Sequence, residues 1–154
     1  MKTIEINGRN YTFEFTFEAA MHEECVEKII SLIDGITSAQ ANENVQGYIA
    51  SIAKAPKTVI NMVYAGLLEH HADEIKNVKD ASNLIKDYFA EHKEDGEGNF
   101  MSLMSLMMET MENDGFFNMI GLDEIFNPGQ KETAQKAPKT PQDHKKKATK
   151  TSEK

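Results

Sequence analysis

The first segment with a chemical signature is His22-Glu23-Glu24-Cys25-Val26. It begins like the helical zinc motif of metalloproteases, which needs two histidines one turn apart so that both rings reach one ion. Val26 stands where the second histidine belongs. The segment therefore predicts an acidic, solvent-exposed helix face with Cys25 turned inward.

Four further residues, His70, His71, Asp73 and Glu74, could together supply two or three metal ligands. His70 and Glu74 are four residues apart, so they share one face of a helix. This spacing is frequent in helices that bind no metal. We interpret the group as the polar end of a helix.

The third segment, residues 95–99, combines acidic residues and glycines as calcium loops do. A calcium loop requires oxygen ligands at its first and third positions and glycine at its sixth. Lys93 occupies a ligand position whether Gly96 or Gly98 is taken as the sixth residue. The segment is therefore predicted to be a flexible linker.

Catalytic motifs are not recognisable elsewhere in the chain. It has no glycine-rich phosphate loop and no G-x-S-x-G turn around a nucleophilic serine. We therefore expect a protein that is not an enzyme, with no catalytic residues, no metal site and no cofactor.

Methionines are concentrated between residues 101 and 119, next to two phenylalanines. Because methionine is flexible and polarizable, a surface rich in it can adapt to different apolar partners. One interpretation is a client-binding face, and the other is that the methionines at helical spacing pack on the core. The candidate client-binding residues are Met101, Met104, Met107, Met108, Met111, Phe116 and Phe117.

The chain should open with a β-hairpin. Residues 3–6 and 11–15 alternate between polar and apolar side chains around Asn7-Gly8-Arg9-Asn10, in which Asn-Gly favours the positive φ angles of tight turns. A lone hairpin is marginally stable in water, so helices must cover its apolar face. That face is predicted to carry Ile4, Ile6, Tyr11, Phe13 and Phe15.

Helical periodicity dominates the rest of the chain to residue 126. A first helix is predicted to start with Thr16 as a hydroxyl cap and to end at Asp34-Gly35. A second, amphipathic helix follows Asn44, and a third, with Pro56 in its first turn, is apolar enough to be the central core element. Asn77 is predicted to cap a fourth helix that ends before residues 94–99. Further helical segments are expected at residues 100–111 and 116–126.

The last part of the chain differs in composition. Residues 128–154 hold eight lysines against three acidic residues, a net charge of +5, so the rest of the chain carries −13. Few of these residues are apolar, a composition typical of disorder. We predict an α+β, mostly α fold: an N-terminal β-hairpin packed on a bundle of five to six helices over residues 1–126, and a disordered, Lys-rich tail over residues 127–154.

The order of these elements and their pattern of polar and apolar residues resemble those of the tail assembly chaperones of long-tailed bacteriophages and prophages of Gram-positive bacteria. The resemblance covers roughly residues 1–125 and contains no invariant chemical motif. It is carried by Ile4-Glu5-Ile6-Asn7-Gly8-Arg9-Asn10-Tyr11-Thr12-Phe13-Glu14-Phe15, by Val59-Ile60-Asn61-Met62-Val63-Tyr64-Ala65-Gly66-Leu67-Leu68 and by residues 78–89.

The resemblance implies a non-catalytic protein of the host cytoplasm, absent from the mature virion. Such a protein binds the tape-measure protein, keeps that long apolar chain soluble and recruits tail-tube subunits around it. The family often makes a longer product by ribosomal frameshifting, for which the codons of Lys145-Lys146-Lys147 offer a candidate position. Self-association is a further expectation, because an exposed apolar helix over residues 100–111 would invite it.

An alternative is an intracellular adaptor or regulatory module whose basic tail contacts nucleic acid. Beyond residue 126 the tail has no Phe, Tyr or Trp that could stack on bases. The acidic body also opposes the binding of nucleic acid. No membrane contact is expected, because the longest apolar-looking stretch, residues 100–108, is far shorter than the roughly 20 residues a bilayer requires.

Overall fold

The computed structural model describes residues 1–122 and opens with the predicted hairpin. Strands β1 (Lys2–Ile6) and β2 (Arg9–Phe13) are antiparallel, with Ile4 opposite Tyr11. The two-residue loop places Asn7 and Gly8 at φ angles of 53° and 71°. Positive φ at both positions is the geometry for which Asn-Gly is suited, as predicted. The second strand, however, begins at Arg9 and ends at Phe13, and not over residues 11–15, because Arg9 and Asn10 already pair with β1.

Helices follow the hairpin, and the predicted fold class, mostly helical with an N-terminal hairpin, is confirmed. The helical segment predicted over residues 116–126 is wrong at its end, because the helix there ends at Met119. The expectations for residues beyond 122, including the Lys-rich tail, lie outside the described residues. None of the described helices is long and apolar enough to cross a membrane. The helices are α1 (Phe17–Met21), α2 (Glu23–Ala41), α3 (Val45–Ile52), α4 (Ala55–His71), α5 (Val78–Glu91), α6 (Phe100–Asn113) and α7 (Phe116–Met119).

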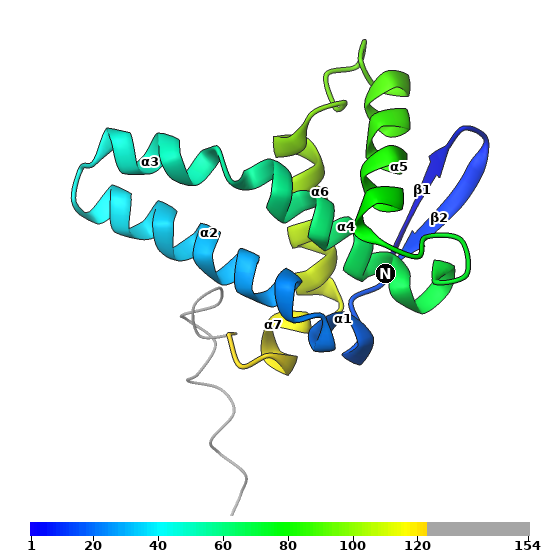
Figure 1. Cartoon of the computed structure of the whole chain (residues 1–154), viewed down its shortest axis with the longest axis horizontal. Helices are drawn as coiled ribbons and strands as arrows, with labels where there is room; N and C mark the ends of the chain where they lie inside the picture. The colour runs from blue at the N-terminus through cyan, green and yellow to red at the C-terminus, as the bar shows by residue number, and fades with distance from the viewer. Residues whose placement is uncertain (123–154) are drawn as a thin grey trace, which may run out of the picture.

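Helix α4 is the central element of the core, as its all-round apolar sequence predicted. It packs against β2 and against α1, α2, α5 and α6 (Figure 1). Its side chains Val59, Met62 and Val63 are at most 1% exposed. The hairpin lies close to α4 because Gly66 has no side chain: a Cβ there would stand 3.0 Å from the ring of Phe15.

The predicted first helix is wrong in three details. The chain breaks at His22, whose ψ of 87° is not helical, so α1 and α2 are separate helices. Thr16 precedes α1 but its hydroxyl caps nothing; it donates a hydrogen bond to Glu69 instead. Helix α2 continues through Asp34-Gly35, because Gly35 meets a neighbouring helix there and is not a helix end.

The predicted caps at Asn44 and Asn77 are confirmed. Asn44 accepts a hydrogen bond from the amide of Gly47 at 3.0 Å, and Asn77 accepts from the amides of Lys79 and Asp80. Asn99 caps α6 in the same way. These side chains satisfy amides that a helix start leaves without partners inside the helix.

Candidate binding surface on a two-helix arm

The C-terminal part of α2 and the whole of α3 form an antiparallel helical hairpin, which we call the arm (residues 30–53). Figure 1 shows the arm extending away from the remaining helices. Helix α3 packs chiefly against α2. The contact is close: a Cβ on Gly35 would stand 2.5 Å from Ser51 Oγ, and one on Gly47 would stand 3.5 Å from Ala39 Cβ. Small residues thus make the interface between the two helices.

The apolar side chains of α3 lie on its outer face. The exposed fractions are 70% for Val45, 42% for Tyr48 and 58% for Ile49, and Ile52 on the same face is half-buried. On the inner face Ser51 is 5% exposed, and its hydroxyl donates to the carbonyl of Gly47. An amphipathic helix of a globular protein normally turns its apolar side to the core. Here that side, the stripe (Val45, Tyr48, Ile49, Ile52), faces solvent.

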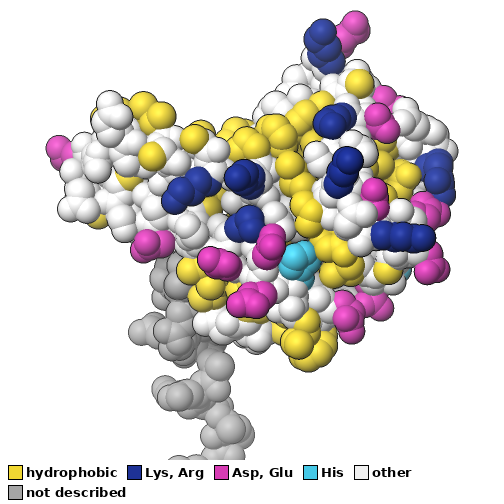
Figure 2. All heavy atoms as spheres, viewed as in Figure 1, with side chains coloured by type: hydrophobic (Ala, Val, Ile, Leu, Met, Phe, Trp, Pro, Cys, Tyr) yellow, Lys and Arg dark blue, Asp and Glu magenta, His cyan; other side chains and the backbone are white. Residues whose placement is uncertain are grey.

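Charge is nearly absent from the arm although the chain is rich in it. Residues 29–53 contain only Asp34 and Glu43 as charged residues, whereas residues 1–122 hold nine Lys and Arg against twenty Asp and Glu. In Figure 2, apolar side chains gather over α3 along the upper edge of the molecule. The stripe is therefore an apolar surface on the least charged part of an acidic body.

Lysines surround the base of the arm. An open hollow between α2 and the start of α4 is lined by Lys28, Lys54 and Lys57 together with Glu27. Lys28 is paired with Glu24 at 3.0 Å, and this hydrogen bond lowers the pKa of the Glu24 carboxyl. Within residues 1–122, Lys54 and Lys57 have no ion-pair partner. The base of the arm is therefore locally positive.

The tip of the arm carries a second shallow hollow beside the stripe. Its walls include Ala39, Gln40 and Glu43 from the end of α2 and the following turn, and Val45 and Tyr48 from α3. Most of the surface exposed in the hollow is apolar, although Gln40, Glu43 and Asn44 also line it. It can receive one apolar side chain from a partner lying along α3.

The methionine-rich segment divides between core and surface. Met107, Met111, Phe116 and Phe117 are at most 3% exposed, so they pack in the core and cannot contact a client in this conformation. Met104 and Met108 are half-buried against the core, and Met101 is 44% exposed. A client-binding role stays a prediction for Met101, Met104 and Met108. The periodicity of the sequence could not separate these two groups, because both recur at helical spacing.

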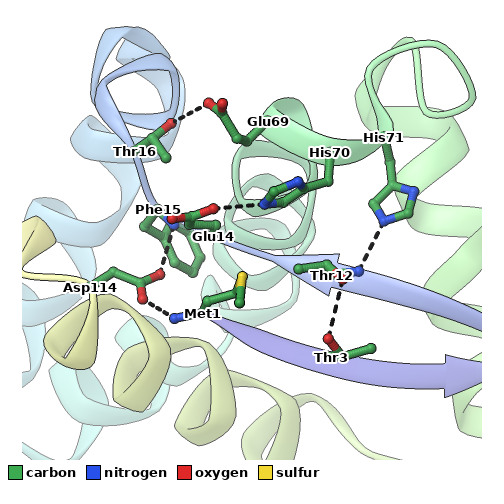
Figure 3. Close-up of polar contacts among 10 residues, drawn as sticks. All are labelled: Met1, Thr3, Thr12, Glu14, Phe15, Thr16, Glu69, His70, His71 and Asp114. Carbon is green, nitrogen blue, oxygen red and sulfur yellow. Dashed lines mark hydrogen bonds and ion pairs between the residues drawn. The ribbon is translucent and has the colours of Figure 1, made fainter.

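The two adjacent histidines of α4 have separate partners. His70 Nε2 lies 2.6 Å from Glu14 Oε2, while His71 Nε2 accepts the backbone N–H of Thr12 at 2.9 Å (Figure 3). Glu74, which was predicted to share a helix face with His70, lies beyond the end of α4 and is paired with Arg9 at 2.6 Å. These residues tie the hairpin to the end of α4. They do not converge on a common point as metal ligands would.

Around the loop after α5, His92 Nδ1 lies 2.7 Å from Asp95 Oδ2, and Asp95 accepts the backbone N–H of Glu97. The amide of Glu97 and then the ring of His92 lower the pKa of the Asp95 carboxyl. The ligand atoms of His92, Asp95 and Glu97 lie within 4.8 Å of one another. Asp95 and Glu97 are exposed, and their bonds close the turn that precedes α6, so we interpret the group as structural.

The segment that begins like a zinc motif contains no reactive thiol. Cys25 is fully buried, and burial raises the pKa of its thiol to about 12. The thiol therefore stays protonated at neutral pH and is a poor nucleophile. The ring of His22 stands edge-on to that of Tyr64, with centroids 5.2 Å apart. The inward position predicted for Cys25 is confirmed.

No family model, curated protein or solved structure matches the chain. The stripe and the arm must therefore be interpreted from their own geometry and chemistry.

Proposed function

We propose that this protein is a non-catalytic assembly chaperone of bacteriophage tails. It acts in the host cytoplasm, binds the tape-measure protein, recruits tail-tube subunits and is absent from the finished virion. The observation that supports a binding function is the stripe: four apolar side chains at helical spacing on the solvent face of a two-helix arm. The phage assignment comes from the resemblance of residues 1–125 to this family.

The chemistry of the stripe suits an apolar helical client. Contiguous exposed apolar side chains on a monomer mark a surface for another protein. Val45, Ile49 and Ile52 are spaced so that they line one side of α3, and an amphipathic helix can pack along such a row. A tape-measure protein is a long apolar chain of this kind.

The charge of the described residues favours a protein client over nucleic acid. With twenty acidic side chains against nine basic ones, the body repels a phosphate backbone. The arm has almost no charge to add to that repulsion or to oppose it. An apolar client carries no phosphate charge for the acidic body to repel, so it can bind the stripe.

Co-expression tests the proposal. The full chain would be produced with the tape-measure protein encoded in the same phage or prophage genome, and the amount of soluble, co-purified tape-measure protein would be measured. We expect the stripe variant Tyr48→Ser/Ile49→Ser to retain at least about tenfold less tape-measure protein than the wild type, because the variant removes apolar area from the centre of the contact. Folding should be unchanged, since both side chains are exposed.

A matched control is offered by α1. Phe17 and Met21 are 64% and 66% exposed, but they lie outside the arm. The variant Phe17→Ser/Met21→Ser removes a similar amount of exposed apolar surface and should retain the client as the wild type does. Equal retention by the wild type and the stripe variant would refute the stripe as the client site, and failure of the wild type to hold the tape-measure protein would refute the chaperone function.

A further inference from the structure

We propose that, when no client is bound, a second copy of this chain covers the stripe, with α3 of one copy packed antiparallel on α3 of the other around a two-fold axis. The proposal concerns the surface to which the proposed function assigns the client. It predicts that client and second copy compete for the stripe. The dimer itself does not depend on the identity of the client.

The spacing of the stripe is symmetric about its own centre. In a two-fold interface each contact occurs twice, so residue i meets residue j while j meets i. An antiparallel pair of α3 helices that cross between Tyr48 and Ile49 places Val45 opposite the partner copy's residue 52 and Tyr48 opposite its residue 49. Every member of the stripe then faces another member. The hollow beside Val45 and Tyr48 is positioned to receive the apolar side chain that arrives from the opposite end.

Charges at the two ends of the stripe select the antiparallel arrangement. Glu43 is two residues before the stripe, at the tip of the arm, and Lys54 is two residues after it, at the base. Antiparallel pairing therefore brings the acidic tip of each arm to the positive base of the other, where Lys54 and Lys57 lack ion-pair partners within residues 1–122. Parallel pairing would bring tip to tip and base to base, where like charges meet.

The arrangement also keeps the acidic bodies apart. Residues 1–122 have a formal charge of −11, from nine basic and twenty acidic side chains, so two copies repel at most faces. The arm extends from the body (Figure 1), and α2 over residues 30–41 alone spans about 18 Å at the helical rise of about 1.5 Å per residue. That length exceeds the Debye length of about 8 Å at physiological salt. Pairing through the arms is thus the contact with the least repulsion.

The size of the surface predicts a weak, reversible dimer. One face of an eight-residue helix is far smaller than the roughly 800 Å² per partner of a standard stable interface. The contact can therefore form at high protein concentration and yield to a client with a longer apolar helix. A reversible cover of this kind keeps the stripe from non-specific association.

Sedimentation equilibrium of the full chain across a range of concentrations tests the dimer. We expect a monomer–dimer equilibrium for the wild type and for the α1 control Phe17→Ser/Met21→Ser, and a monomer for the stripe variant Tyr48→Ser/Ile49→Ser. A wild type that stays monomeric up to about millimolar concentration, or a stripe variant that dimerises as well as the wild type, would overturn the proposal.

Charge reversal tests the antiparallel register. Glu43→Lys and Lys54→Glu should each weaken the homodimer by about two- to thirtyfold, because each variant places like charges together twice, and exposed pairs contribute ~0.2–1 kcal/mol apiece. An equimolar mixture of the two variants restores both pairs in a heterodimer, so its association should return to that of the wild type. Dimerisation that is insensitive to either reversal, or a mixture that stays as weak as the single variants, would contradict this register.

The dimer and the proposed function can fail separately. A monomeric wild type that still retains the tape-measure protein through the stripe would refute the dimer and leave the chaperone function standing. The opposite result is a wild type that dimerises, a stripe variant that does not, and no retention of the tape-measure protein by the wild type. That result would support the dimer and refute the chaperone function.

Discussion

His71 shows how one side chain can make folding sensitive to pH. Its Nε2 accepts the N–H of Thr12, which requires that this nitrogen carry no proton. Burial lowers the pKa of the ring, with Glu74 opposing the shift and the charges of His70 and Arg9 adding to it. Because the pKa in the folded state lies below that in the unfolded state, the unfolded chain binds more protons as pH falls. The stabilisation is therefore complete above the unfolded value of about 6.5 and is lost as pH falls from there through the folded value.

The variant His71→Gln isolates this effect, because glutamine offers a neutral oxygen as acceptor and does not titrate. The free energy of unfolding would be measured by urea denaturation of both proteins between pH 5 and 8. We expect the difference between them to be constant above about pH 6.5 and to shift in favour of His71→Gln below it. A difference that does not change with pH would show that the ring is not held neutral by the fold.

The partners of such residues could not be predicted from the sequence. The spacing of His70, His71 and Glu74 predicted the polar end of a helix, but α4 ends at His71, so His70 and Glu74 do not share a helix face. Their partners, Glu14, Thr12 and Arg9, lie on or beside the hairpin some 56 to 65 residues away in the chain. Helical periodicity contains no information about contacts over that separation.

Gly35 decides how closely the two helices of the arm approach. Alanine normally stabilises the interior of a helix relative to glycine by about 1 kcal/mol. In Gly35→Ala the new Cβ would stand 2.5 Å from Ser51 Oγ, so either this hydroxyl leaves its hydrogen bond to the carbonyl of Gly47 or the helices separate. We expect a net destabilisation of about 1–3 kcal/mol, as for other overpacked sites, measured by urea denaturation.

The double variant Gly35→Ala/Ser51→Ala provides the control, because it removes the hydroxyl that the new methyl group meets. Ser51→Ala alone costs only the hydrogen bond to the carbonyl of Gly47. The double variant should therefore recover most of the loss, giving a coupling energy of about 1 kcal/mol or more. Additive effects would indicate that the two residues do not limit the approach of the helices.

Turns and helix caps that depend on a few adjacent residues were predictable from the sequence. Features that depend on packing between helices were less predictable. The Asn7-Gly8 turn and the caps Asn44 and Asn77 are determined by a few adjacent residues, so the sequence predicted them. The break at His22 and the passage of α2 through Gly35 depend on packing against α3 and α4, which no local pattern records. The stripe was visible as an amphipathic pattern, but the pattern alone does not say that the small residues on the opposite face form the helix contact.

For the whole molecule, the arrangement of layers predicts an uneven distribution of stability. Helix α4 is surrounded by five other elements, whereas α3 packs chiefly on α2 through small residues and leaves its apolar side in water. Few buried apolar contacts mean a low free energy of local opening. The arm should therefore open while the core stays folded. Native-state amide hydrogen exchange, at a concentration low enough to keep the chain monomeric, would show amides of α3 exchanging at least about tenfold faster than those of α4.

Two of the three asparagine caps within residues 1–122, Asn44 and Asn77, allow this gradient to be tested at matched positions. Loss of a cap costs about 1 kcal/mol, which is roughly a fivefold change in the equilibrium for local opening. Asn44→Ala should accelerate exchange in α3 by about that factor and leave α4 unchanged, because opening of the arm does not require the core to unfold. Asn77→Ala removes the corresponding cap from α5 and should not affect α3. If Asn44→Ala instead accelerated exchange equally in α3 and α4, the arm and the core would unfold as one unit, and the stripe would belong to a rigid surface and not to an independently opening one.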